Sequence, residues 1–414
     1  MSTMLRETVA SLDVGHSRVL ALVAEAKEDG DLVIRGAGVA KLKGALKAGQ
    51  VVDFSQVVEA IRDAVREAEI LVDGVIEKVW VSVGGDFVVD RFTTTTLQLG
   101  KKARPVSPQD LARLWEAARW QNLPSGHSVL NVLPHSFTLN DQEDLVNPEG
   151  MEGTQLSMHA LVLSSKEGPI NTLSKAINEA GLKIQGFLFS PVASSLAVLT
   201  SEERAIGSLV VDMGHSTTAY ALWYQGHVMA TGAVPYGASM VDQDLVQYFV
   251  TTFPAAEEVK LGKLTLLAET IDLEEVVNLP TLDGRPRHVS RREACTVAAA
   301  RVAELLRLVG LGYTQQLTQE VRLLSVVLCG GGSHLEGITE KAREVFGCPS
   351  RLGDPRNFTD ATGCLTEPLF PFRSAACAIG LLHYGSQTNQ GSISDVSSKL
   401  MRAKSSFWER LLGR

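Results

Sequence analysis

A five-residue motif occurs twice in this sequence and limits the folds that the chain can adopt. Residues 11–22 read SLDVGHSRVLAL and residues 211–222 read VDMGHSTTAYAL, so Asp-x-Gly-His-Ser stands at 13–17 and again at 212–216. Each copy lies between two apolar segments, a pattern that is typical of two strands joined by a tight turn. One copy stands near the start of each half of the chain. The sequence therefore predicts a duplicated α/β domain whose two hairpins face each other.

A third loop is rich in glycine and follows another apolar strand. Residues 324–328 read LSVVL, Cys329-Gly330-Gly331-Gly332-Ser333 follows, and a helix is predicted over 336–346. Helical spacing predicts further helices over 54–72, 108–120, 170–180, 255–275, 291–311 and 375–383, and apolar or alternating segments predict strands over 78–83, 128–133 and 157–163. Residues 86–162 are interpreted as a small α+β insert, with Trp115 and Trp120 expected in a core.

These loops have the composition of a phosphate site. Backbone N–H groups are exposed at the tip of a hairpin, and glycine lets the backbone approach an anion closely. Asp13 and Asp212 stand where carboxylates can hold Mg²⁺, through water because this ion keeps much of its hydration shell. Gly330–Gly332 leave room for a base or a ribose. Hydroxyl groups that can bind phosphate oxygens belong to Ser17, Ser216, Thr217 and Thr218.

The composition excludes several classes of protein. The 414 residues are 45% hydrophobic and 21% charged, which is enough apolar material for more than one core. The net charge of −8 argues against a nucleic-acid partner, because neutralising phosphates requires clustered cations. The sequence has no Walker A motif, no G-x-S-x-G, no C-x-x-C pair and no apolar run of the ~20 residues that cross a bilayer. We therefore expect an intracellular protein of a reducing compartment.

The last part of the sequence has a different character. Residues 385–398 (GSQTNQGSISDVSS) are small and polar, which is typical of a flexible linker. Residues 399–414 (KLMRAKSSFWERLLGR) carry five cations and one acid, and at ~100° per residue their apolar side chains share one face. Such a helix suits an anionic membrane surface, with docking on a partner or on the protein's own body as the alternative. The residues expected at the membrane are Leu400, Met401, Lys404, Phe407, Trp408, Arg410, Leu411 and Leu412.

Together these features resemble a known family. Two D-x-G hairpins, an Ala256-Glu257-x-x-Lys260 segment and a late glycine loop are similar to the actin/Hsp70/sugar-kinase superfamily, and within it to the bacterial FtsA cell-division family. The resemblance covers nearly the whole chain, on stretches that include LDVGHSRVLALVAE (12–25), HSVLNVLPHSFTLNDQEDLVNPEGMEG (127–153), GLKIQGFLFSPVASSLAVLTSEER (181–204), VLCGGGSHLEGI (327–338) and AIGLLHYG (378–385).

The resemblance implies the architecture of the whole chain. The fold class would be α/β, an actin-like two-lobed ATPase fold with an FtsA-type 1C insert and a C-terminal amphipathic helix. This insert distinguishes FtsA from actin, MreB and sugar kinases more sharply than the phosphate loops do. The implied divisions are subdomain 1A (1–85 and 163–193), the 1C insert (86–162), subdomain 2A (194–245 and 325–385), subdomain 2B (246–324), a linker (386–398) and a membrane-targeting helix (399–414).

The resemblance also implies that ATP and Mg²⁺ bind between the two lobes. Phosphate-binding residues would be Asp13, Gly15, His16, Ser17, Arg18, Asp212, Gly214, His215, Ser216 and Thr217, and adenosine-binding residues would be Glu257, Lys260, Gly330, Gly331 and Gly332. From the residues alone, the two histidines are expected to be loop side chains that face solvent rather than ligands. Arg18 replaces the common lysine, and the second loop lacks two glycines and a carboxylate of the family pattern, with Ala219 at its last position. We therefore expect nucleotide binding with weak or no hydrolysis.

The function implied by the resemblance is structural. An FtsA-like protein would form protofilaments and anchor the FtsZ ring to the cytoplasmic face of the inner membrane at the division septum, where it recruits later division proteins. Arg301 and Arg307 would meet the acidic C-terminal peptide of FtsZ, with an ordinary solvated surface as the alternative. Two other hypotheses remain. A PilM-like pilus-assembly adaptor would lack the basic tail, and a small-molecule kinase would need a catalytic base over its substrate.

Overall fold

The computed structural model describes residues 8–27, 30–42, 44–120, 123–317, 321–365 and 372–388. The helix predicted over 399–414 and the linker beyond residue 388 lie outside these residues. In the described part of the chain, no helix has both the length and the apolar character needed to cross a bilayer.

Two sheets carry the duplication that the repeated motif predicts. The first contains β1 (Thr8–Val14), β2 (Arg18–Ala26), β3 (Leu32–Lys41), β6 (Lys78–Val83), β13 (Lys183–Phe189) and β21 (Phe358–Asp360). The second contains β14 (Ser208–Met213), β15 (Thr218–Tyr224), β16 (His227–Val234), β19 (Ser325–Cys329) and β20 (Ser350–Leu352). The order β3-β2-β1-β6-β13 in the first sheet matches β16-β15-β14-β19-β20 in the second. In both, the motif joins two antiparallel strands, and the first of them also pairs in parallel with the next strand of the sheet.

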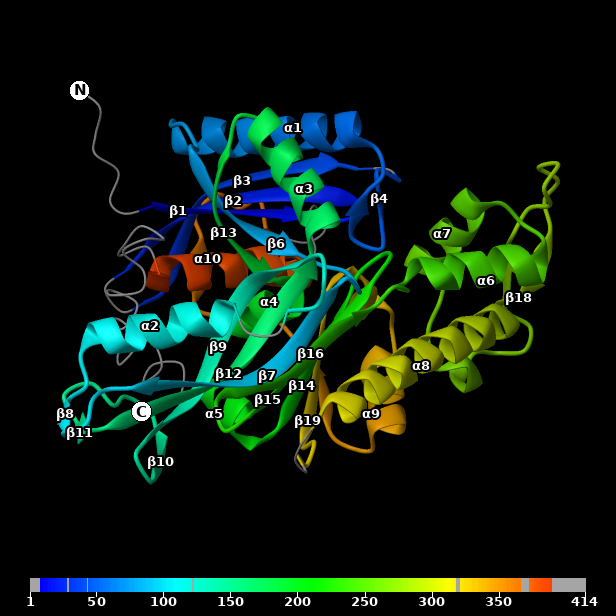
Figure 1. The fold of residues 1–414 in the computed structure, drawn as a ribbon. Coiled ribbons are helices and arrows are strands. Elements are labelled where there is room, and N and C mark those ends of the chain that lie inside the picture. The colour runs from blue at the N-terminus through cyan, green and yellow to red at the C-terminus, as the bar shows by residue number, and fades with distance from the viewer. Residues whose placement is uncertain are drawn as a thin grey trace.

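Helices cover both faces of the first sheet. The helices α1 (Phe54–Val72) and α3 (Glu167–Glu179) lie on its outer face, while α4 (Ser190–Val198) and α10 (Ala376–Thr388) lie between the two sheets (Figure 1). The helix α1 begins after Asp53, whose carboxylate accepts a 3.1 Å hydrogen bond from the Gln56 backbone N–H. Its buried residues, including Val57, Ile61 and Ala64, recur at helical spacing and pack on the sheet. The predicted helix over 54–72 and strand over 78–83 are confirmed.

The insert is a small layered unit with its own core. Its sheet has the order β10-β9-β12-β7, and α2 packs on it. The bounds are β7 (Val88–Gln98), β8 (Arg104–Pro105), α2 (Pro108–Arg119), β9 (His127–Leu139), β10 (Gln142–Leu145), β11 (Glu152–Gly153) and β12 (Gln155–Lys166). Leu111 and Leu114 of α2 are buried against Leu156 and Met158 of β12. The prediction for Trp120 was wrong: it is 79% exposed because it caps the end of α2, beyond the buried face.

The insert also contacts the edge of the second sheet. The backbone N–H of Thr231 in β16 donates a 2.8 Å hydrogen bond to the Asp90 carboxylate of β7. The ring of His135 in β9 stacks on His227 in β16, with centroids 4.9 Å apart and planes inclined by 22°. Burial, with His227 as the next contribution, lowers the pKa of His135 to about 3. A neutral histidine pair therefore lies where the insert meets the second half.

This histidine pair should make the protein acid-labile. The unfolded chain takes up a proton near the ordinary histidine pKa, whereas folded His135 does not, so the free energy of unfolding falls as the pH drops below that value. Between pH 7 and pH 5 we expect His135 to contribute a loss of about 1–2 kcal/mol. Denaturant unfolding of wild type and His135→Gln at both pH values measures it. Burial raises the pKa of half-buried Asp90 to about 6, and this shift changes stability in the opposite direction. The contribution of His135 is therefore read from the difference between wild type and the variant.

The control for this measurement is His288→Gln, since His288 is exposed on β18 (His288–Ser290). The control should keep the wild-type pH dependence, and His135→Gln should lose part of it. Parallel curves for all three proteins would contradict the assignment to His135.

The second half carries an additional group of helices beside its sheet (Figure 1). These are α6 (Ser239–Phe249), α7 (Phe253–Gly262), α8 (Arg291–Gln316) and α9 (Ile338–Phe346), with the short hairpin of β17 (Val276–Asn278) and β18. The helix predicted over 255–275 was wrong in its second part, because α7 ends at Gly262 and Leu264 and Leu266 then enter the core without helical structure. The linker predicted from residue 385 also starts too early, since α10 continues to Thr388.

Candidate functional site

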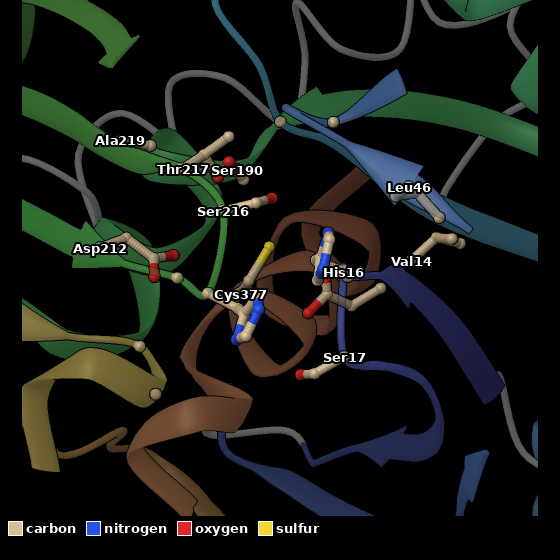
Figure 2. Close-up of a pocket in the computed structure, with 18 of the residues that line it drawn as sticks. Val14, His16, Ser17, Leu46, Ser190, Asp212, Ser216, Thr217, Ala219 and Cys377 are labelled. Carbon is tan, nitrogen blue, oxygen red and sulfur yellow. The ribbon is translucent and has the colours of Figure 1, made fainter. Parts of the chain in front are cut away.

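A cavity of about 290 Å³ lies between the two repeated hairpins. It is lined by the tips of β1–β2 and β14–β15, by α7 and α10, and by the glycine loop after β19. Figure 2 shows His16 and Ser17 of the first hairpin, Ser216 and Thr217 of the second, and the sulfur of Cys377 between them. All residues predicted for phosphate and adenosine line this one cavity: Asp13, Gly15, His16, Ser17, Arg18, Asp212, Gly214, His215, Ser216, Thr217, Glu257, Lys260, Gly330, Gly331 and Gly332.

The two hairpins close with the same turn. The backbone N–H of Gly15 donates to the Arg18 carbonyl at 2.9 Å, and that of Gly214 donates to the Thr217 carbonyl at 2.8 Å. The second hairpin is supported by the loop before α6, where a Cβ on Gly237 would lie 2.6 Å from the carbonyl oxygens of Gly214 and His215. Only glycine permits this approach, so the tip is held in place by backbone rather than by side chains.

Each motif aspartate is held by a serine from a neighbouring element. Ser82 of β6 donates to Asp13, and Ser194 of α4 donates to Asp212, both at 2.6 Å. Burial raises the pKa of both carboxyl groups, that of Asp212 to about 6, while these hydrogen bonds and Arg18 oppose the shift. The charge of Asp13 raises the Asp212 pKa further, so the two carboxylates interact across the cavity. A cation between the hairpins would relieve this repulsion.

The motif histidines contact each other across the cavity. The rings of His16 and His215 are stacked, with centroids 4.5 Å apart and planes inclined by 13°. Both side chains are also half-exposed, so each ring contacts the other and keeps a face toward the cavity. Their contact joins the tips of hairpins that belong to different halves of the chain.

The side of the cavity predicted for adenosine is built from α7 and the glycine loop. Glu257 and Lys260 lie on α7, where buried Lys260 forms an ion pair with Asp242 of α6. Gly330 has φ +81°, and a Cβ there would lie 2.3 Å from Asp212 Oδ1 and 2.7 Å from the Met213 carbonyl oxygen. The loop therefore packs directly on the end of β14, which leaves its outer surface to a ligand.

Several lining residues were not predicted from the sequence. They are Ser82, which holds Asp13, Ser374, which lies directly before α10, and Cys377 in the first turn of α10. Ser194, which holds Asp212, is fully buried and was not predicted either. The Arg18 guanidinium donates a 3.2 Å hydrogen bond to the Ser374 carbonyl. Ser82 stands two residues before Gly84-Gly85, a turn signal at a strand end that marks it as a candidate lining residue.

The oxygen atoms that line the cavity suit a metal ion that keeps part of its water shell rather than one that is held by protein atoms alone. Within the described ranges, no cluster of three or more His, Cys, Asp or Glu side chains is arranged to hold a metal ion. Asp13 and Asp212 provide carboxylate oxygens, and the nearby hydroxyls are those of Ser17, Ser216 and Thr217. Oxygen ligands and few direct protein contacts are what Mg²⁺ accepts beside phosphate groups.

The other predicted contact residues lie away from this cavity. Arg301 of α8 forms an ion pair with Asp244 of α6 at 2.6 Å and with Glu304 at 2.6 Å. Arg307, further along α8, is exposed. The predicted membrane residues between 400 and 412 lie outside the described residues.

Comparison of the structure with solved structures defines the class of protein. It resembles the structure described as "PilM-PilN type IV pilus biogenesis complex" with a TM-score of 0.61 at 19% identity, covering 92% of this chain and 99% of that chain. It resembles MreB 5 of Spiroplasma citri bound to AMPPNP with a TM-score of 0.53 at 13% identity, covering 94% and 98%. The fold is therefore actin-like, and the expected fold class is confirmed for the described residues.

Sequence comparison identifies the family. The family model described as "Cell division protein FtsA" matches residues 209–376, and that described as "SHS2 domain inserted in FTSA" matches residues 92–164. Cell division protein FtsA of Escherichia coli is 30% identical over 98% of this chain and 97% of its own length. The chain belongs to the FtsA family of cell division proteins. The likeness to PilM, at 19% identity, shows the fold alone.

Proposed function

We propose that this chain binds ATP between its two halves, assembles with itself, and ties FtsZ polymers to the cytoplasmic face of the inner membrane at the division septum. The observation that supports this most strongly is the convergence of both D-x-G hairpins and the glycine loop on one cavity, in a chain of the FtsA family. The boundaries of subdomains 1A, 1C, 2A and 2B remain predictions within this proposal. The recruitment of later division proteins is also a prediction.

ATP would bind as a conformational ligand. Its phosphates would be held by the hairpin backbones and by the hydroxyls of Ser17, Ser216 and Thr217, and the adenosine would lie between α7 and Gly330–Gly332. Mg²⁺, when bound, neutralises phosphate charge, and Asp13 and Asp212 would hold it through water. Ala219 stands where the family pattern has a carboxylate, so hydrolysis is expected to be weak or absent. The nucleotide then favours one arrangement of the two lobes over another, and the size of this shift is set by the difference between its affinities for the two arrangements.

The FtsZ contact is proposed on α8. Exposed Arg307 can meet an acidic peptide directly. Arg301 would have to exchange its ion pairs with Asp244 and Glu304 for carboxylates of the partner. The C-terminal segment 399–414 would provide the membrane contact, through an apolar face that includes Trp408 and a basic remainder.

Flotation with anionic liposomes tests the anchoring role. We would compare the full chain, a chain that ends at Ser398, and Trp408→Glu, each with and without FtsZ. A charge on the apolar face opposes insertion, so the full chain should float and carry FtsZ with it, whereas the other two should lose at least about tenfold in membrane-bound fraction.

The matched control is Ser406→Glu. It adds the same charge, but at ~100° per residue Ser406 lies opposite the apolar face, so most flotation should remain. Equal loss in both glutamate variants would point to general electrostatics rather than insertion. If none of the proteins floats, the proposed anchoring role fails, while membership of the FtsA family stands.

A further inference from the structure

The stacked histidines join the two halves of the chain at the proposed phosphate site. His16 follows β1 and His215 follows β14, and their rings lie in contact inside the cavity that both hairpins line. A polyphosphate that contacts the tips of both hairpins would lie beside the position where the rings meet. The pair is therefore placed to compete with phosphate for the space between the hairpins.

The surroundings keep both rings neutral. Burial lowers the pKa of His215 to about 4, with His16 and Lys260 lowering it further. Burial also lowers the pKa of His16, and the Leu46 backbone opposes the shift. Neutral imidazoles can stack face to face, whereas two imidazolium ions would repel each other. The charged and titratable groups that line the same cavity are Asp13, Arg18, Asp212, Glu257, Lys260 and Cys377.

We propose that His16 and His215 form a clasp across the phosphate site: nucleotide phosphates bind by parting the stacked rings, and the parted rings take up protons from solvent and donate hydrogen bonds to phosphate oxygens. This inference rests on the proposed nucleotide site. A nearby anion favours the charged form of an imidazole, so the protons are bound together with the ligand.

The clasp makes nucleotide affinity depend on pH. Because binding takes up protons, affinity rises as the pH falls. The pKa values of Asp13 and Asp212 are also raised, and these carboxylates are the ones proposed to hold Mg²⁺, so any pH dependence that they cause is present in wild type and in a histidine variant alike. The part of the pH dependence of affinity that the histidines cause is therefore the difference between wild type and a variant that lacks both histidines.

Calorimetric titration of the full chain with Mg-ATP tests the clasp. Wild type and the double variant His16→Ser, His215→Ser would be titrated at about pH 6 and about pH 8.5, in buffers of different ionisation enthalpy so that proton uptake is measured directly. A pKa rise of about one unit in one ring corresponds to about a tenfold gain in affinity, so the wild type should gain about tenfold more than the variant on acidification. At about pH 8.5 the variant should bind more tightly than wild type, since it has no stack to part.

One control and two contradicting outcomes complete this experiment. The control His288→Ser, on exposed β18, should follow wild type at both pH values. If the double variant binds nucleotide with wild-type pH dependence and proton uptake, the clasp is wrong while the nucleotide site stands. If neither protein binds Mg-ATP at either pH, the proposed nucleotide site fails and the clasp fails with it.

Discussion

The substitution Gly380→Ala should unfold the protein or lower its free energy of unfolding by about 3 kcal/mol or more. Gly380 lies on α10 where this helix packs on α4, and a Cβ there would lie 1.8 Å from the backbone carbonyl oxygen of Ala193. Both helices are buried between the two sheets, so neither can retreat without opening the central core. Denaturant unfolding monitored by circular dichroism measures the change.

The same substitution elsewhere provides the matched control. Gly310 is also helical, in α8, but its Cβ would meet only the Phe346 ring at 3.6 Å, an ordinary van der Waals contact. Gly310→Ala should therefore be neutral or stabilising by up to about 1 kcal/mol, because alanine favours helix over glycine. Similar results for both variants would show that the close approach of α10 to α4 does not limit stability.

Removing either partner of the Lys260–Asp242 pair should cost about 3–5 kcal/mol, because the remaining charge stays buried. The two side chains are only 6% and 5% exposed. Asp242 Oδ1 has no hydrogen-bond partner within the described ranges, so Asp242 depends on Lys260 for its main contact. Lys260→Met and Asp242→Leu should each be destabilising, and the double variant should recover most of the loss. Chemical unfolding of the three variants measures this coupling.

The ion pair of Lys341 with Glu344, a carboxylate at the surface, is the control for this cycle. Glu344 is 59% exposed, so Glu344→Gln should change stability by less than about 0.5 kcal/mol. The double variant also separates stability from binding: a folded protein without Lys260 should still lose ATP affinity if the adenosine side of the proposed site is correct. Additive losses in the cycle would contradict a coupled buried pair.

Local patterns in the sequence predicted the elements that depend on local chemistry. The repeated motif predicted two matching hairpins, and apolar spacing predicted α1 and β6 with the bounds that the structure shows. The residues proposed for the nucleotide converge on one cavity because the duplication brings the ends of β1 and β14 face to face.

Features that depend on packing between distant segments could not be predicted. The bonds from Ser82 to Asp13 and from Ser194 to Asp212, and the stack of His16 on His215, join residues far apart in the chain. Gly385 looked like the start of a linker, but its Cβ position lies 2.5 Å from Trp80, so here glycine permits close packing of α10. The charge pattern after Gly262 resembles a helix, but burial of Leu264 and Leu266 selects a different backbone.

The attachment of the insert has a mechanical consequence. Its chain leaves and re-enters the first half at β6 and α3, while its surface contacts β16 of the second half through Asp90 and the His135–His227 stack. The insert is thus attached to the first half by its chain and to the second half by contacts at β16. If one half rotates against the other, either the contacts between the insert and β16 break or the insert moves with the second half. A rotation moves atoms further the more distant they are from its axis. A small displacement at the hairpin tips would therefore correspond to a larger displacement of the β8–β11 ribbon at the far end of the insert.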